Sequence, residues 1–110
     1  MQMKFLVIVT PRQVPLPPGM IADILAAQKE WLKARVADDT VEALYSFVGG
    51  GGMGIATVES HEAMNELLVS SPAFPISDYE VTAIGDFETM IDAAIAAARQ
   101  AASMMPGPPA

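Results

Sequence analysis

Four short runs of the chain are apolar at nearly every position and resemble β-strands. They span residues 4–9, 43–48, 55–58 and 80–84. A strand with one solvated face alternates apolar and polar residues, so near-continuous apolar runs indicate a sheet that is covered on both faces. We therefore expect one face to pack against helices of the chain and the other to meet another subunit.

Helical periodicity separates these runs. An amphipathic helix is predicted for residues 20–36 because its apolar residues recur at helical spacing: Ile21, Ile24, Leu25, Trp31 and Leu32. Ser60 is a suitable N-cap for a second helix, which the proline-containing turn at residues 71–75 ends. The four prolines within residues 10–19 predict a stiff loop, and the glycines at 49–52 predict a hairpin turn or a closely approached stretch of backbone.

The order of these elements is β-α-β-β-α-β, which is the order of a ferredoxin-like α+β fold. In that fold a four-stranded antiparallel sheet carries two helices on one face. We expect residues 1–86 to form this domain, residues 87–103 an extra C-terminal helix rich in alanine, and residues 104–110 a flexible tail. Small side chains in residues 87–103 suit close contact with another element, such as one in a neighbouring subunit.

Composition excludes several classes of function. The chain has 110 residues, of which 52% are hydrophobic, and this suits one compact domain. Its net charge is −7 without any basic cluster, which argues against binding of nucleic acid or of an anionic membrane. The absence of cysteine excludes disulfides and thiolate chemistry, and with a single histidine we expect no metal. No apolar run approaches the ~20 residues of a membrane span, so we expect a cytoplasmic protein.

The first predicted helix carries most of the candidate site residues. Gln28 lies at the centre of its apolar stripe and should point towards the sheet, where a buried amide either satisfies a backbone group or reaches a ligand. Trp31 lies on the same stripe and is a candidate substrate-binding residue. Lys29 at the edge of the stripe, or Arg35, could supply a cation to a carboxylate or an enolate. In such positions both residues are more often solvated helix residues.

Four other side chains are candidates outside that helix. Tyr45 and Tyr79 could donate a hydrogen bond to a carbonyl or enolate oxygen, although strand tyrosines are often core or interface residues. His61 could act as a general base near neutral pH, but a helix N-terminus disfavours its cation. Arg12, in the proline-rich loop, could close over a bound ligand or lie exposed. The glycine run lacks the lysine and the following helix of a phosphate-binding loop.

Three segments resemble the muconolactone isomerase family. They are the helix with the pattern Ser-x-Glu-Ala-hydrophobic at residues 60–64, the Pro-x-Phe-Pro turn at residues 72–75, and the Asp-x-Glu-Val strand at residues 78–81. The Pro-x-Phe-Pro turn is the most specific of the three. The resemblance spans approximately residues 3–87, and the C-terminal helix lies outside it.

The resemblance implies a dimeric α+β barrel, in which two ferredoxin-like sheets close face to face, with homo-oligomers as the expected state. It also implies a double-bond shift in a small unsaturated lactone by proton abstraction and return, without metal or organic cofactor. Such chemistry needs a base and a donor or cation for the dienolate oxygen. The alignment places Gln28 at a position that is acidic in the family, and a glutamine cannot act as a carboxylate base.

We therefore expect a cofactor-independent isomerase or cyclase for a small unsaturated lactone or carbonyl compound. Gln28 and Tyr45 would orient the carbonyl, Lys29 or Arg12 would stabilise negative charge, and His61 or Glu30 would be the candidate base. Two alternatives stay open. The chain could be a non-catalytic oligomeric module for ligand binding or assembly, or a cofactor-free monooxygenase of the kind that related α+β barrels support.

Overall fold

The computed structural model describes residues 2–105 and contains four strands and three α-helices. In chain order these are β1 (Met3–Pro11), α1 (Pro18–Ala37), β2 (Val41–Ser46), β3 (Gly52–Val58), α2 (His61–Ser70), a 3₁₀ turn (Phe74–Ile76), β4 (Ser77–Ile84) and α3 (Phe87–Met104). Among these elements no helix is long and apolar enough to cross a membrane.

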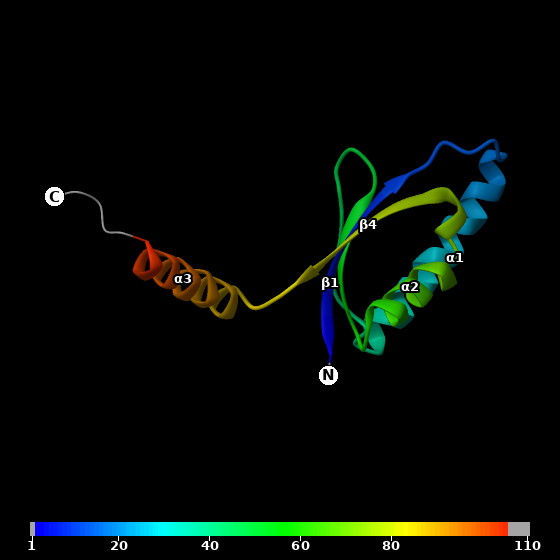
Figure 1. Ribbon diagram of the computed structural model, residues 1–110. Helices are drawn as coiled ribbons and strands as arrows, with labels where there is room; N and C mark the ends of the chain where they lie inside the picture. Colours follow the sequence, from blue (N-terminus) through cyan, green and yellow to red (C-terminus); the bar gives the residue numbers. More distant parts are fainter. Residues whose placement is uncertain (1, 106–110) are drawn as a thin grey trace.

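The strands form one antiparallel sheet in the order β2-β3-β1-β4. Helices α1 and α2 lie together on one face of this sheet (Figure 1). This arrangement confirms the predicted ferredoxin-like α+β fold, with α3 added after the last strand. The predicted strand boundaries shift by a few residues, because β2 begins two residues before its apolar run and ends before Phe47 turns into the hairpin.

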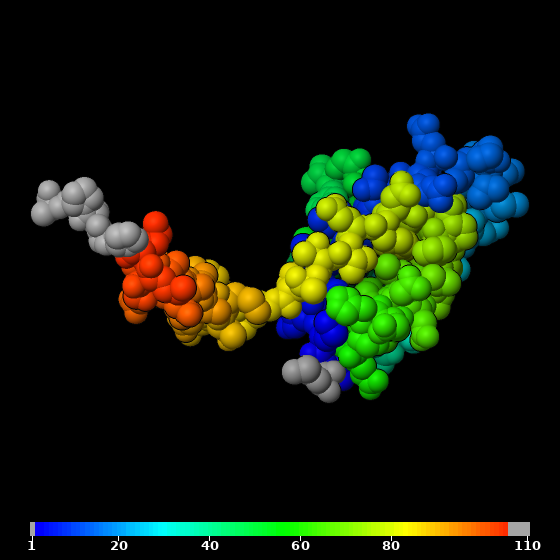
Figure 2. All heavy atoms as spheres, in the orientation of Figure 1, coloured from blue at the N-terminus to red at the C-terminus, as the bar shows by residue number. Residues whose placement is uncertain are grey.

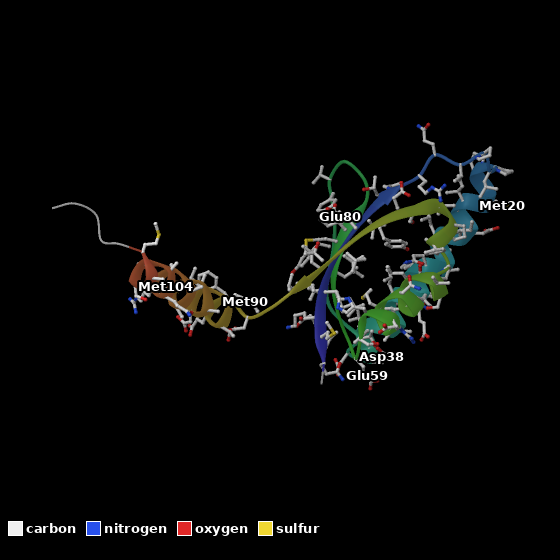
Figure 3. All side chains as sticks on the ribbon, viewed as in Figure 1. Met20, Asp38, Glu59, Glu80, Met90 and Met104 are labelled. Atoms are coloured by element: carbon white, nitrogen blue, oxygen red, sulfur yellow. The ribbon has the colours of Figure 1, made fainter. Side chains whose placement is uncertain are left out.

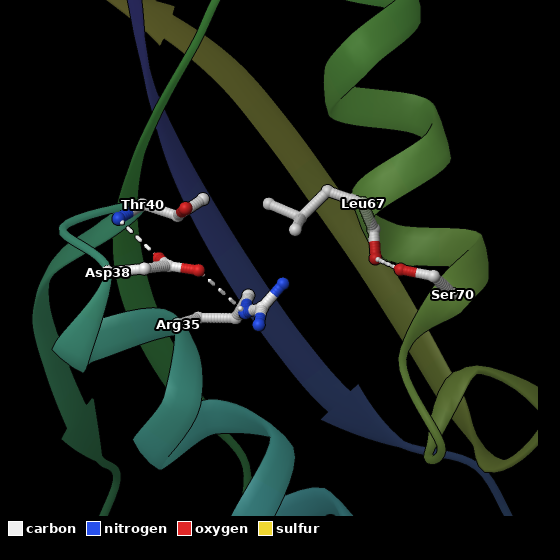
Figure 4. A network of polar contacts seen from close by, with 5 residues as sticks. All are labelled: Arg35, Asp38, Thr40, Leu67 and Ser70. Carbon is white, nitrogen blue, oxygen red and sulfur yellow. Dashed lines mark hydrogen bonds and ion pairs between the residues drawn. The ribbon is translucent and has the colours of Figure 1, made fainter.

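Helix α1 begins earlier than the sequence pattern predicted. Pro18 occupies its first turn, where the missing N–H would be unpaired in any case and the fixed φ angle is already helical. The helix ends in a polar turn in which the Asp38 carboxylate accepts a hydrogen bond from Thr40 N at 3.0 Å and pairs with Arg35 at 3.3 Å (Figure 4). The hydrogen bonds from Thr40 lower the pKa of Asp38, so the carboxylate at the C-cap of α1 is charged at neutral pH.

The chain between β3 and β4 is held by local hydrogen bonds. The hydroxyl of Ser60 accepts from Ala63 N at 3.0 Å, which confirms the predicted N-cap of α2. The hairpin between β2 and β3 contains Gly50 and Gly51 at positive φ. A Cβ on Gly51 would collide with the carbonyl oxygen of Val9, so this turn requires glycine.

The core lies between the sheet and the two helices. Its buried members are Phe5, Val7, Val41, Ala56 and Met64. They come from β1, β2, β3 and α2, and the registers pair Phe5 with Ala56, and Val41 with the same Ala56. Directly paired residues share a face of an antiparallel sheet, so this set defines the helix-covered face.

The opposite face of the sheet is covered by no other element among residues 2–105. The register places apolar side chains of three strands on it: Leu6, Ile8, Ala43, Tyr45, Met53 and Ile55. Tyr45 is 68% exposed, and the other five keep part of their surface open. The near-continuous apolar runs therefore arise from a sheet whose second face is left uncovered by residues 2–105.

Helix α3 stands away from the rest of the molecule. It follows β4 after Gly85 and Asp86 and projects from the sheet (Figures 1 and 2). The molecule is 71 Å long but only 29 and 24 Å across for this reason. Met104 ends α3, and residues 106–110 of the predicted tail lie outside the described residues, so the tail stays a prediction.

Candidate functional site

A cavity of about 590 Å³ lies between the helices and the covered face of the sheet. Helix α1 contributes Leu25, Gln28, Trp31 and Leu32 to its wall, and α2 contributes Met64 and Leu67. The floor is the middle of the sheet, and the turn between α2 and β4 closes one side. A cavity of this size is in the range of about 300–1,000 Å³ that is usual for small-molecule sites.

Gln28 is fixed in this wall by a hydrogen bond from a distant part of the chain. Its Oε1 accepts from the backbone N of Ala73 at 2.9 Å, and Ala73 is buried. The sequence left open whether Gln28 would bind a backbone group or a ligand. With Oε1 bound to the turn, the NH₂ group at Nε2 remains to donate a hydrogen bond to a bound molecule.

The turn that holds Gln28 also holds the second polar group of the wall. Ser71 is buried, and its hydroxyl lies 2.9 Å from the hydroxyl of Tyr79 on β4. The ring of Phe74 stacks on Tyr79 at a centroid distance of 6.1 Å. The Pro-x-Phe-Pro turn thus places an amide and a hydroxyl pair at one side of the cavity.

Glycines form part of the floor of the cavity. Gly52 and Gly54 of β3 lie on the covered face opposite Val9 and Val7 of β1. A Cβ on Gly52 would come within 2.6 Å of the Tyr45 carbonyl oxygen. The absence of side chains here leaves space above the sheet for a flat ligand.

The two predicted tyrosines differ in how they meet the cavity. Tyr79 shares the covered face, because the register pairs it with Val9. Tyr45 belongs to the cavity wall but is paired with Met53, which is itself opposite Ile8 on the open face. Strand alternation therefore places the Tyr45 side chain on the open face and the neighbouring Ser46 on the covered face.

Of the remaining predicted residues, Trp31 lines the cavity and four others lie elsewhere. The Arg35 guanidinium lies 5.6 Å from the centre of the Trp31 ring. Lys29 lines a separate groove between α1 and the β2 edge of the sheet. Arg12 is exposed, and its Nε lies 3.6 Å from Oδ1 of Asp78. The ring of His61 makes a T-shaped contact with the ring of Phe5, with 5.3 Å between their centroids.

Three serines of the wall were missed by reasoning from the sequence: Ser46, Ser71 and Ser77. Ser71 was visible only as part of the turn motif, and nothing in the sequence indicated that its hydroxyl would meet a tyrosine eight residues later. That contact depends on how the turn returns the chain to β4.

The wall of the cavity carries no charged side chain among the described residues. Its polar members are Gln28, Trp31, Tyr79 and the three serines, whereas Tyr45, which also lines it, carries its side chain on the open face. Within residues 2–105, no three His, Asp or Glu side chains lie together as a potential metal site. The arrangement can donate hydrogen bonds to a carbonyl oxygen and enclose an apolar molecule.

No protein-family model and no curated protein matches the chain. A solved crystal structure of muconolactone isomerase is similar to it, with a TM-score of 0.69 and 27% sequence identity. The chain resembles the muconolactone isomerase family. The match covers 76% of this chain and 90% of the isomerase chain, so nearly the whole of the isomerase fold has a counterpart here. The resemblance inferred from the turn and its flanking segments is confirmed.

Proposed function

We propose that this chain is a cofactor-independent isomerase or cyclase that acts on a small unsaturated lactone or carbonyl compound. The observation that carries the proposal is the cavity of about 590 Å³ with Gln28, Ser71 and Tyr79 grouped on one wall. The similarity to a muconolactone isomerase structure supports the same class of reaction.

In this proposal the polar wall binds the oxygen on which negative charge develops. The Tyr79 hydroxyl, hydrogen-bonded to Ser71, donates to the carbonyl or enolate oxygen, and Gln28 Nε2 orients the same group. Preorganised donors at such a position stabilise a transition state far more than they would in water. Trp31 and the aliphatic wall exclude water from the bound molecule.

The absence of charged side chains from the described wall limits which substrates can bind. A carboxylate within the cavity would lose its hydration without gaining a cationic partner, because the described wall has no Lys or Arg. We therefore propose that the part of the substrate inside the cavity is uncharged. Lys29 and Arg12 would meet only groups that extend outside it.

Proton abstraction is the step for which this wall supplies no carboxylate or imidazole. Neither His61 nor Glu30 belongs to the described cavity wall. This observation favours a second candidate function, in which the same cavity binds a neutral apolar ligand without turnover. In both cases the open sheet face pairs with that of a second copy to form a dimeric α+β barrel.

Incubation with α-angelica lactone, a neutral unsaturated lactone, in D₂O separates the two functions. An isomerase incorporates deuterium and moves the double bond into conjugation, which proton NMR records. The variant Tyr79→Phe should then lower kcat/KM by about 100-fold. Thr82→Val is the matched control, because it removes a hydroxyl from the same strand on the open face. Saturable binding without exchange would support the binding function instead.

Gln28→Glu tests the missing base directly. The glutamate keeps an oxygen for Ala73 N and adds a carboxylate at the wall. Under the isomerase proposal, exchange of substrate protons should rise in this variant at a pH where the carboxylate is ionised. An unchanged exchange rate would place the base elsewhere.

A further inference from the structure

Helix α3 carries an apolar stripe that nothing in the described chain covers. Phe87, Ile91 and Ile95 recur every four residues along one side and are 75%, 41% and 42% exposed. The helix projects beyond the body, as the positions of Met90 and Met104 show in Figure 3. Most helical stability in proteins comes from packing of an apolar face. We therefore expect this stripe to pack against another apolar surface.

Two acidic residues border the stripe on one side. Successive residues of a helix are 100° apart, so Glu88 and Asp92 lie about one turn apart on the same flank of the apolar stripe. Over its first two turns the stripe is therefore a narrow apolar surface with one negative edge, and Arg99 follows on the same flank about two turns beyond Asp92.

A second apolar groove, with a charged edge of opposite sign, lies between α1 and the β2 edge of the sheet. The groove is lined by Leu25, Leu32 and Val36 together with Leu44 of β2, and three of these remain at least 43% exposed. Lys29 and Lys33 lie one turn apart on α1, on one flank of the row formed by its apolar groove residues. This groove is a narrow apolar surface with one positive edge.

We propose that α3 of one copy docks antiparallel into the α1 groove of a second copy. Antiparallel packing brings equivalent flanks of two helices together, which pairs Glu88 with Lys33 and Asp92 with Lys29. The same register sets Ile95 beside Leu25. Lys33 is free to exchange partners, because its pair with Glu30 at 3.8 Å is exposed and weak.

The length of the connection excludes docking within one chain. Helix α3 follows β4, while the groove lies at the β2 edge of the sheet, three strand spacings away. Those spacings amount to about 14 Å, whereas Ile84 at the end of β4 and Phe87 at the start of α3 are three residues apart and can be separated by at most about 11 Å. In the register that sets Glu88, at the start of α3, beside Lys33, the helix in the groove must therefore come from another molecule.

Docking would also bear on the cavity. Leu25, Gln28, Leu32 and Leu44 line both the groove and the cavity. A helix seated in the groove would therefore border the cavity and shield it from solvent. The docking itself does not depend on whether the cavity is catalytic.

Mixing of two single-cysteine variants tests the proposal, since the chain has no cysteine of its own. Lys29→Cys and Asp92→Cys proteins are mixed and treated with a short bis-maleimide, and the products are separated on a denaturing gel. The expected product is the cross-linked heterodimer, which only contact between two copies can form. Glu66→Cys on α2 replaces Asp92→Cys in the control mixture, because it is also acidic and exposed.

The other outcomes overturn the proposal. Cross-linking of Asp92→Cys with itself, in preference to Lys29→Cys, would show that α3 pairs with α3. A yield no higher than that of the Glu66→Cys mixture would show that the groove is empty. As an independent measurement, K29E/K33E should lower the mass found by sedimentation, and adding E88K/D92K to the same chain should restore it. Failure of this restoration would also contradict the pairing.

Discussion

The hydrogen bond between Gln28 and the α2–β4 turn should contribute measurably to stability, and Gln28→Leu tests it. Leucine places a side chain of similar size in the cavity wall but has no acceptor for the backbone N–H of Ala73. In the wild type this N–H donates to Gln28 Oε1 at 2.9 Å, and Ala73 is only 4% exposed. A buried N–H without a partner costs about 1–3 kcal/mol. Because the cavity can admit water beside this group, we expect about 1–2 kcal/mol.

The expected loss is large enough to measure by thermal or urea unfolding. For a domain of this size, 1 kcal/mol corresponds to a shift in Tm of about 4 °C, so Gln28→Leu should melt about 4–8 °C below the wild type. Gln100→Leu is the matched control, since Gln100 is exposed on α3 and surface substitutions usually change stability by less than about 0.5 kcal/mol. Equal Tm values for the two variants would refute the structural role of Gln28.

Three further predictions concern other parts of the chain. Ser60→Ala should reduce the free energy of unfolding by about 1 kcal/mol, because it removes the N-cap of α2; an unchanged urea midpoint would contradict this. The hydrogen bond from Thr89 lowers the pKa of Asp86, so this cap stabilises α3 above the ordinary Asp pKa of about 3.9 and is lost as the pH falls through the lower folded pKa. Far-UV circular dichroism should record that loss in the wild type and a weaker pH dependence in Asp86→Asn. Ile8→Lys, on the open sheet face, should lower the mass measured by light scattering if this face joins two copies, whereas an unchanged mass would argue against a barrel.

The sequence was sufficient for the order and class of the elements. Helical spacing around Trp31, the cap at Ser60 and the glycine hairpin are local signals, and each depends on residues that lie within a few positions of one another. Gln28 could be placed on the buried side of its helix for the same reason. The resemblance also rested on a local motif, the turn that contains Phe74.

The candidate site was less predictable because its contacts join distant segments. Gln28 and Ala73 are 45 residues apart, and no periodicity links them. Tyr45 illustrates the same limit, since a shift in strand register between Val41 and Ala43 sets which face the following residues occupy. A shift of one residue in a strand moves every later side chain to the other face.

By itself, then, the sequence determined a ferredoxin-like α+β chain with an added helix, and strands with apolar side chains on both faces. Local patterns of polarity and turn residues were enough because they specify each element. Tertiary structure alone decided that one sheet face encloses an uncharged cavity and that Ser71 and Tyr79 meet at its wall. It also decided that the other face and α3 are left uncovered by the part of the chain that the structure describes. Those features depend on strand register and on the packing of helices over the sheet, which bring together residues that no local pattern connects.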